Sequence, residues 1–585
     1  MIKIISVLAF VSMSLLCFGQ PTFHGDTTPT YDQAIAIYEE LASKHVNATL
    51  YQKGPTDSGK PLHMFVISNR DMPGIQPFET RQFDQRVVLI NNGIHSGEAC
   101  GINASIMLSR FLLEDERAQE LLQNTVVCIV PIYSIGGSLQ RNSHSRANQE
   151  GPAEYGFRGN ARNLDLNRDF TKMDSYNAQS FAKMFHEWDP HVYLETHTSN
   201  GADYQYTMTL LSTQKDKLDT AVSEVMQSMI LPGLYKRMSE KQEEMVRYVN
   251  VFGRSPEEAG ITGFLDSPRY SSGFATQFQC MGFMSEAHML KPFEDRVNAT
   301  FELMLSLLEE VEEHGKEIAL ARYDARNALV WQEAFPLNWE LDTVASDTIQ
   351  FNGYRSEYRK SAVTGRDRLY YDRAAPTQFE IPVYDHYRGT NDVMKPRYYV
   401  VPQARREVIE RLHHNGVEML VLVQDTILES EVYYISHFNT VSKPYEGHYL
   451  HDQTEVRTEV REEMLRAGDV LVPMYTDRDR FVVEVLEPSS ADSYFNWNFF
   501  DEILQQKEWF SGYVFEDEAA RMLEEDEGLR SMFEQMKADP EFAESPFAQL
   551  YWLYQQSPHY EEQHMKYPVL RIMNEHELPT RPMRP

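Results

Sequence analysis

Basic residues are few in this sequence compared with its acidic residues. The 585 residues contain 55 Lys and Arg against 87 Asp and Glu, which gives a formal net charge of -32 at pH 7. Phosphate groups would repel such a chain, so we expect no nucleic-acid partner. The hydrophobic share of 42% is that of a folded globular protein, and the length predicts roughly two to four domains.

Cysteine is also scarce, with only 4 residues in the whole chain. Cys17 lies in an apolar N-terminal run, and Cys100, Cys128 and Cys280 lie in apolar segments further on. A sparse set of this kind predicts buried free thiols with at most one disulfide. Stability must therefore come from hydrophobic cores.

Long apolar runs are absent after the N-terminus, so we expect no stable membrane span. A short basic start at Lys3 is followed by the mostly apolar residues 4–18, which are too few to span a bilayer comfortably. This pattern predicts a signal peptide over residues 1–19 and a secreted or periplasmic protein. A lipoprotein anchor on Cys17 is the competing interpretation, but Leu16 stands where a small residue is expected.

The sequence has no Gly-x-Ser-x-Gly motif, which leaves a serine-hydrolase site unsupported, and it has no internal repeat. What it does have is an alternation of predicted strands and helices. The strands are predicted at 87–90, 126–132, 192–194 and 281–285, and the helices at 99–113, 175–188 and 296–316. This order predicts an α/β fold with a mixed, mostly parallel sheet flanked by helices, which binds ligands at the carboxyl ends of its strands.

The character of the sequence changes at about Tyr323, where short aromatic segments separated by turns begin. Residues 481–486 are predicted as one of several strands, and 516–537 as an acidic helical region. We therefore predict a domain over residues 20–322 and a C-terminal α+β region over residues 323–585. The role of that region is unknown; one hypothesis is that it restricts access to the first domain.

A possible metal site lies where the first buried strand meets the helix that follows it. His95 and Glu98 are three residues apart at this junction, and His197 follows another predicted strand. Imidazole and carboxylate groups together suit Zn²⁺, and three protein ligands leave one position for water, as in catalytic sites. An isolated His-x-x-Glu pair is common by chance, and a cap or a surface pair is its structural alternative.

Over roughly residues 30–320 the sequence resembles the zinc metallocarboxypeptidase family typified by carboxypeptidase A, as a bacterial secreted member with a C-terminal extension. That family has His-x-x-Glu, an Asp-x-Asn-Arg segment, a His after a strand and a late Glu, in this order. The resemblance implies that His95, Glu98 and His197 bind one zinc ion. It implies that Asp165 orients a ligand histidine, and that the pair Asn167-Arg168 grips the substrate's terminal carboxylate.

The same resemblance implies the remaining catalytic roles. Glu286, near the end of a late strand, matches the general base, and Tyr270 is the best match for a substrate-capping tyrosine. Arg158 is the favoured residue for polarising the scissile carbonyl, with Arg146 and Arg141 as rivals. The implied activity is a zinc metallocarboxypeptidase that acts on peptides with a free C-terminus.

Two other classes of function stay open. On the same scaffold the protein is alternatively an amidase or deacylase, or a hydrolase of peptidoglycan stem peptides. It is otherwise a non-catalytic binding protein, although the complete ligand set and Glu286 argue against that. The uncharged residues Ser271, Ser272, Thr276 and Gln277 near Tyr270 favour neutral or apolar substrate side chains. The oligomeric state is not determined by the sequence.

Overall fold

The structure is a computed structural model that describes residues 21–69 and 85–583. The predicted signal peptide over residues 1–19, with Cys17, lies outside the described residues. Within the described ranges, no helix has both the length and the apolar character needed to cross a bilayer. Cys100, Cys128 and Cys280 are buried free thiols, which confirms that prediction.

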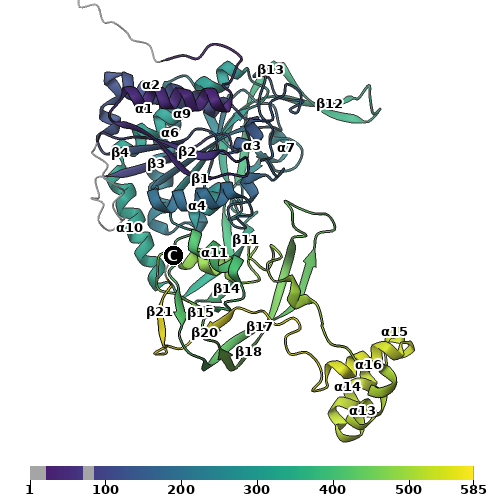
Figure 1. Cartoon of the computed structure of the whole chain (residues 1–585). Helices are drawn as coiled ribbons and strands as arrows, with labels where there is room; N and C mark the ends of the chain where they lie inside the picture. Colours follow the sequence, from purple (N-terminus) through teal and green to yellow (C-terminus); the bar gives the residue numbers. More distant parts are fainter. Residues whose placement is uncertain (1–20, 70–84, 584–585) are drawn as a thin grey trace, which may run out of the picture.

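A mixed sheet with strand order β1-β2-β4-β3-β5-β10-β6-β7 forms the centre of the first part of the chain (Figure 1). Its strands are β1 Ala48–Pro55, β2 Pro61–Ile67, β3 Arg86–Asn91, β4 Thr125–Val130, β5 Val192–Ser199, β6 Met208–Ser212, β7 Met245–Arg247 and β10 Met281–His288. Parallel pairs join β4 to β3, β3 to β5, β5 to β10 and β6 to β7. The pairs β1–β2, β2–β4 and β10–β6 are antiparallel. The predicted mixed, mostly parallel sheet is confirmed.

Both faces of this sheet are buried, since every residue of β3, β4 and β5 is buried. In β3, Val88 and Ile90 belong to one hydrophobic core and Val87 and Leu89 to another, as the alternation of side chains along a strand requires. The first core includes α1, α2 and α9. The second includes α4 and also residues of the C-terminal region, among them Phe481. The C-terminal region therefore packs on the α4 side of the sheet.

Three principal helices of this part form close to where the sequence predicts them: α2 Cys100–Glu114, α4 Tyr176–Trp188 and α9 Phe293–Glu313. The other two are α1 Tyr31–Lys44 and α10 Gly315–Trp331. Shorter helices are α3 Ile135–Ser138, α5 Thr220–Val225, η6 Met226–Ile230, α6 Leu231–Glu240, α7 Pro256–Ala259 and α8 Ser271–Thr276. Helix α1 begins after Thr30, whose side chain forms a capping box with Gln33. Helix α10 runs through residue 322, so the predicted division of the chain falls inside a helix.

The C-terminal region contains a second sheet with strand order β18-β17-β20-β15-β19-β16-β21. Its strands are β15 Tyr398–Val401, β16 Leu420–Leu422, β17 Thr426–Thr440, β18 His451–Leu465, β19 Val470–Pro473, β20 Leu570–Ile572 and β21 Thr580–Pro582. The long hairpin of β12 Asp347–Lys360 and β13 Asp367–Tyr384 joins β9 Ile261–Thr262 and β8 Asn250–Val251, and β11 Ala334–Leu341 pairs with β14 Tyr387–Met394.

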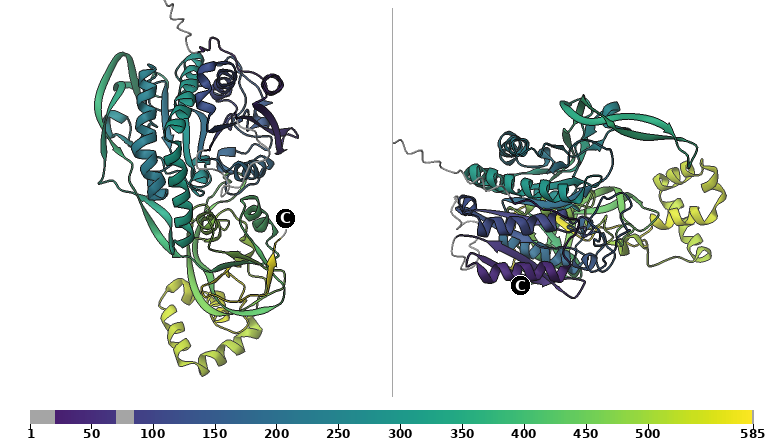
Figure 2. Two further views of the ribbon diagram at one scale, coloured as in Figure 1. Left: turned by 90° about the vertical axis from the view of Figure 1, so that its left-hand side faces the viewer. Right: turned by 90° about the horizontal axis from the view of Figure 1, so that it is seen from above.

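Helices complete this region and confirm its α+β class. They are α11 Arg406–His414, α12 Asp479–Leu486, α13 Gly512–Glu525, α14 Glu527–Met536, α15 Pro540–Glu544 and α16 Pro546–Gln555. Figures 1 and 2 show α13 to α16 as a group set apart from the central sheet. The prediction of a strand over residues 481–486 is wrong, because this segment lies in α12, which is buried along its whole length. A short run that is apolar throughout has no period that separates a strand from a helix.

Candidate active site

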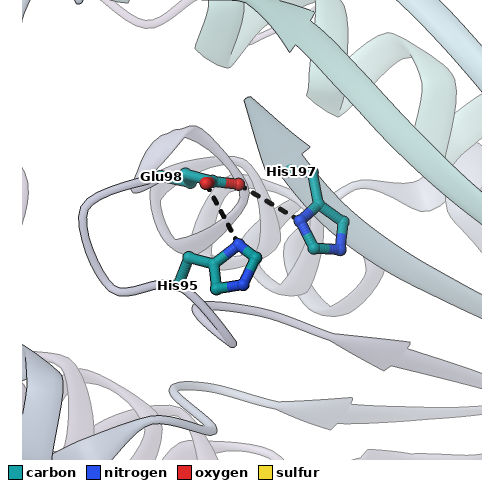
Figure 3. A group of neighbouring side chains, drawn as sticks. All are labelled: His95, Glu98 and His197. Carbon is teal, nitrogen blue, oxygen red and sulfur yellow. Dashed lines mark hydrogen bonds and ion pairs between the residues drawn. The ribbon is translucent and has the colours of Figure 1, made fainter. Parts of the chain in front are cut away.

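The three candidate metal ligands come from two places that the sheet brings together. His95 and Glu98 lie in the turn between β3 and α2, where the Glu98 N–H donates to the His95 carbonyl at 2.8 Å. Gly93, at φ 66°, allows the chain to leave β3 sharply. His197 lies on β5, which pairs in parallel with β3. Figure 3 shows the three side chains pointing toward one another.

Their donor atoms form a compact group. One ligand atom from each of His95, Glu98 and His197 lies within 4.8 Å of the others. The Nδ1 atom of His95 is 3.1 Å from Glu98 Oε1, and the Nδ1 atom of His197 is 3.1 Å from Glu98 Oε2. All three residues are buried. The structure therefore places the two imidazoles and the carboxylate in one cluster, as the sequence predicts.

Each histidine is held from behind by a carboxylate. Asp165 Oδ1 lies 2.9 Å from His95 Nε2, and Glu195 Oε2 lies 2.9 Å from His197 Nε2. These contacts favour a proton on Nε2 and leave Nδ1 as the lone-pair donor toward the cluster, which is how carboxylates commonly orient metal-binding histidines. The donor set therefore fits one zinc ion, with a fourth position left for water.

Charged neighbours set the protonation of the cluster. Burial opposes ionisation of Glu98, but His95, Arg146 and His197 outweigh it and hold the pKa of this carboxyl well below its usual range. Burial likewise opposes protonation of His197, but Glu195 and Glu98 hold its pKa well above the usual value. The cluster thus holds an ionised Glu98 carboxylate beside a protonated His197, and binding of a metal would displace the proton from His197.

The predicted carboxylate-binding pair lies in a short 3-10 turn, η4 Leu166–Arg168. Asp165 caps this turn by accepting the Asn167 N–H at 2.9 Å, so the residue that orients His95 also shapes the segment that follows. Asn167 Oδ1 accepts the Ser271 N–H at 3.1 Å. The Arg168 guanidinium lies 4.4 Å from the centre of the Tyr270 ring. Asn167, Arg168 and Tyr270 therefore form one contiguous group.

The structure separates the three candidate arginines. Arg158 lines the cavity and is 45% exposed at its side chain, and it donates to Asp165 Oδ2 from Nε at 3.0 Å and from Nη2 at 2.8 Å. Arg146 also lines the cavity, and its Nη2 atom donates to Glu98 Oε1 at 2.7 Å, an oxygen that Arg158 Nη1 also contacts at 3.5 Å. Arg141 donates to backbone carbonyls of residues 28, 29 and 154. Its guanidinium is therefore directed to the chain, not to the metal cluster.

Glu286 lies on β10 opposite His197 in the parallel pairing of β10 with β5. Residues paired in this way project from the same face of a sheet, so the two side chains are neighbours. Burial raises the pKa of the Glu286 carboxyl to about 7, and the nearby Glu98 carboxylate adds to this. A bound cation would lower this pKa.

One cavity of about 360 Å³ collects these side chains. Its lining includes the three ligand candidates together with Arg158, Asn167, Arg168, Tyr270 and Glu286. The structure therefore brings together all of the predicted site residues except Asp165, which contacts His95 from behind. Their catalytic and binding roles stay predictions.

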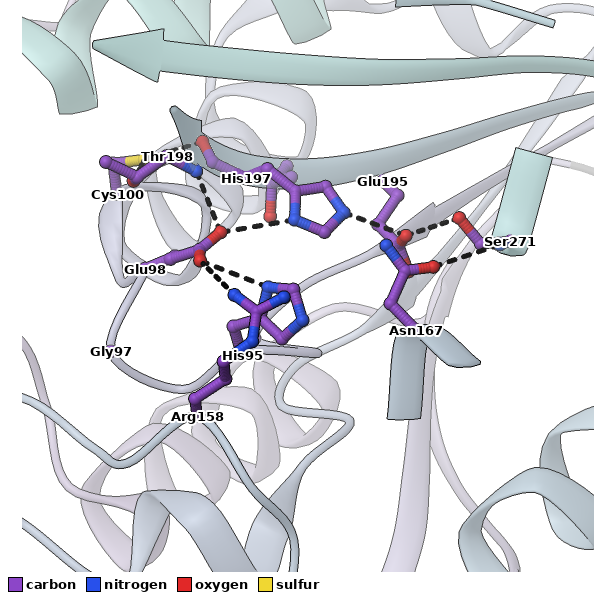
Figure 4. A network of polar contacts seen from close by, with 12 residues as sticks. His95, Gly97, Glu98, Cys100, Arg158, Asn167, Glu195, His197, Thr198 and Ser271 are labelled. Carbon is purple, nitrogen blue, oxygen red and sulfur yellow. Dashed lines mark hydrogen bonds and ion pairs between the residues drawn. The ribbon is translucent and has the colours of Figure 1, made fainter. Parts of the chain in front are cut away.

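Sequence reasoning did not single out Glu195, and it considered Ser271 only for the preference for substrate side chains. Figure 4 shows that Glu195 contacts His197 and accepts a hydrogen bond from the Ser271 hydroxyl. A local signal for Glu195 was present, because residues two apart on a strand share a face and Glu195 precedes His197 by two. Ser271 has no such signal, since its contact depends on the packing of α8 beside β5.

Comparison with known proteins identifies the family of this domain. Residues 35–254 match the family model described as zinc carboxypeptidase. Carboxypeptidase Z of Gallus gallus is 31% identical over 151 residues, which cover 25% of this chain and 22% of that protein. The carboxypeptidase N catalytic chain of Homo sapiens is 31% identical over 156 residues, which cover 25% of this chain and 31% of that protein. The chain thus spans less than a third of either relative.

Solved structures give weaker likenesses. A metallo-carboxypeptidase from Burkholderia cenocepacia aligns with a TM-score of 0.37 and 14% identity, covering 49% of this chain and 70% of that one. Carboxypeptidase A from Helicoverpa armigera aligns with a TM-score of 0.34 and 16% identity, covering 51% and 75%. Over residues 35–254 this chain matches the zinc carboxypeptidase family, as the order of the motifs predicts.

Proposed function

We propose that this protein is a zinc-dependent metallocarboxypeptidase that hydrolyses the C-terminal peptide bond of peptides with a free C-terminal carboxylate. One observation carries the proposal: the His95, Glu98 and His197 cluster, the Glu286 carboxylate and the Arg168 guanidinium meet at a single cavity. A metal site, a base and a carboxylate-binding group within one cavity are the parts that this reaction requires.

The metal would be held by the Nδ1 atoms of His95 and His197 and by the Glu98 carboxylate. When bound, Zn²⁺ lowers the pKa of a water molecule and polarises the carbonyl of the scissile bond. Asp165 and Glu195 keep the two imidazole rings in the orientation that this requires, through contacts of 2.9 Å each.

Glu286 is the proton carrier in this proposal. It takes the proton of the attacking water and later delivers it to the leaving amine, which needs a carboxylate that is neither strongly acidic nor strongly basic. Its partly buried position beside His197 supplies such an environment, because burial raises the pKa of its carboxyl. Arg158 reaches the same cavity with a half-exposed guanidinium and stabilises the oxyanion that develops on the substrate.

Arg168 and Asn167 bind the terminal carboxylate of the substrate. A planar guanidinium forms paired hydrogen bonds with a carboxylate, and Tyr270 stacks against it and limits its motion. An internal peptide bond offers no such negative charge at this position, so the pair makes the enzyme an exopeptidase. The cavity is also lined by Leu211, Phe264 and Met284, which supports a preference for neutral or apolar C-terminal side chains.

Hydrolysis of two matched substrates tests the proposal. Blocked dipeptides with a free and with an amidated C-terminus are assayed with the wild-type protein and with Glu286→Gln, and bound zinc is quantified in both. We expect cleavage of the free carboxylate only, and a fall in kcat of about 100-fold to 10,000-fold in Glu286→Gln with zinc retained. Glu240→Gln, at an exposed ion pair on α6, is the matched control.

The other outcomes identify the alternatives. Bound zinc without cleavage of either dipeptide contradicts carboxypeptidase activity and leaves the amidase, deacylase or peptidoglycan hydrolase on the same scaffold. Absence of zinc from protein refolded with a stoichiometric supply supports the non-catalytic binding protein. We also propose that the protein is exported; N-terminal sequencing of the mature chain tests this, and an intact residue 1 contradicts it.

A further inference from the structure

A turn from the C-terminal region reaches the carboxylate-binding segment of the first domain. Strands β17 and β18 are joined through residues 441–450, and within this connection Tyr445 and His448 exchange backbone hydrogen bonds of 2.7 and 3.0 Å. Between them Glu446 has φ 49° and Gly447 has φ 87°. Two positive φ values make this a type I′ turn, in which Asn or Gly is the usual first residue. Glutamate is therefore an unfavourable choice at its position.

The two side chains at this turn contact both ends of one short segment. Glu446 Oε2 accepts the backbone N–H of Asp165 at 2.7 Å. The Tyr445 hydroxyl accepts the Nε–H of Arg168 at 3.0 Å. Asp165 orients His95 and caps η4, and Arg168 ends it. The turn thus holds the segment that links the metal cluster to the carboxylate-binding arginine.

The contact with Tyr445 decides which donors of Arg168 remain for a ligand. Nε is used by the tyrosine hydroxyl, and Nη1 donates to the Asn167 carbonyl at 2.8 Å. Across the residues that the structure describes, Nη2 donates to no protein group. Because Tyr270 covers one face of the guanidinium, the group is fixed both in its plane and in its rotation within that plane. A guanidinium held in this way loses little entropy when it binds a carboxylate.

The turn packs against buried side chains of the protein. The Tyr445 ring stacks on the fully buried Trp497, with centroids 6.1 Å apart and an interplanar angle of 21°. The Arg269 guanidinium lies 5.0 Å from the Trp497 ring and pairs with the buried Asp492 at 2.8 Å. His448 Nε2 lies 2.7 Å from Asp174 Oδ2, across the same contact between the two regions.

We propose that the Tyr445–Glu446 turn completes the substrate-carboxylate site, with Tyr445 and Glu446 as positioning residues for Arg168 and Asp165. The inference rests on the proposed function, since it assumes that Arg168 binds the terminal carboxylate. The C-terminal region then takes part in substrate recognition instead of forming a separable module. Glu446 holds this unfavourable conformation while its carboxylate accepts the Asp165 N–H.

Steady-state kinetics on the full-length, zinc-loaded protein tests this inference. We expect Tyr445→Phe to raise KM for a blocked dipeptide with a free carboxylate by about five- to tenfold, with a much smaller change in kcat. Tyr449→Phe is the matched control, because Tyr449 lies in the same connection and is 53% exposed.

Substitutions of Glu446 test its contact with the Asp165 N–H separately from the stability of the turn. Glycine is well suited to its left-handed conformation, so Glu446→Gly should preserve or raise the melting temperature and yet raise KM about threefold or more. Glu446→Gln keeps an oxygen acceptor and should recover most of this loss. An unchanged KM in both Tyr445→Phe and Glu446→Gly, with both variants folded, overturns the proposal.

A binding measurement shows whether the effect depends on the carboxylate. Calorimetry on zinc-loaded Glu286→Gln compares the Kd of the free and the amidated dipeptide, with and without Tyr445→Phe. We expect the substitution to weaken binding of the free acid about five- to tenfold and to leave the amide nearly unchanged. Equal weakening of both ligands contradicts a role at the carboxylate. If the wild-type protein cleaves no dipeptide with a free carboxylate, the proposed function itself fails. If the wild-type protein cleaves it and the variants behave like the wild type, only the proposed role of the turn fails.

Discussion

Replacement of Glu195 by glutamine should weaken zinc binding although the side chain keeps its size. Glu195 is fully buried and surrounded by donors. Its Oε1 accepts from the Tyr193 hydroxyl at 2.8 Å and from Asn91 Nδ2 at 2.9 Å, while Oε2 accepts from the Ser271 hydroxyl and lies 2.9 Å from His197 Nε2. A glutamine offers one oxygen and one NH₂ group. Its NH₂ group must therefore face donor groups that the second carboxylate oxygen of Glu195 accepts from.

Either orientation of the amide carries a cost. If the NH₂ group faces His197, the ring must carry its proton on Nδ1, the atom directed at the metal cluster. If the NH₂ group faces Asn91, a buried donor loses its acceptor, which costs about 1–3 kcal/mol of folding free energy. Loss of such a partner behind a metal ligand typically lowers metal affinity about 10- to 100-fold, or about 1.4–2.7 kcal/mol.

Competition with a chromophoric chelator measures the zinc Kd of wild type and Glu195→Gln, and thermal melts with and without zinc report folding. Glu187→Gln is the matched control, because its carboxylate forms a surface pair with Lys53 at 2.8 Å. We expect a higher zinc Kd and a smaller rise in melting temperature on addition of zinc. A zinc Kd within twofold of wild type in a folded variant would refute the reasoning about the histidine partner.

Two further predictions concern stability. In Gly101→Ala the new Cβ would lie 2.0 Å from Thr196 Oγ1, so α2 must move away from β5. We expect urea denaturation to show that the free energy of unfolding falls by about 1–3 kcal/mol. A change below about 0.5 kcal/mol would contradict this packing. Burial and two carboxylates on α9 raise the pKa of Glu243 to about 7 from 4.5. Between these values the folded state keeps a proton that the unfolded state releases, so the free energy of unfolding should fall as pH rises, by about 1 kcal/mol after allowance for partial exposure. Denaturant titrations below and above this window should show that Glu243→Gln removes that fall; the same pH dependence in both proteins would contradict it.

The elements that the sequence predicts well are those whose signal is local. The run of β-branched and aliphatic residues before His95 predicts β3, because strand preference depends on residues close in the chain. The strand predicted over residues 481–486 is wrong because the local sequence does not separate the two structures there. The neighbours of Phe481 are apolar on every side, and only their packing between the sheet and the C-terminal core decides for a helix.

The metal-ligand candidates were predictable because their spacing is part of a familiar motif order. His95 and Glu98 are three residues apart, and His197 follows the short apolar run 192–194, which begins β5. Of the two carboxylates on the far side of the imidazoles, the resemblance implies Asp165, whereas Glu195 was not predicted. Asp165 is 70 residues from His95 in the chain, and its 2.9 Å contact exists because η4 is folded against the turn after β3.

The sequence by itself therefore determined the class of the fold, the identity of the metal-ligand candidates and the resemblance to the zinc carboxypeptidase family. Tertiary structure alone decided that Glu286 stands beside His197, because that depends on the register of β10 against β5. It alone brought Tyr445 to Arg168 across 277 residues. The physical reason is the same in both cases: hydrogen bonds and packing act over a few ångströms of space, whereas sequence patterns report only on residues within a turn or a strand of one another.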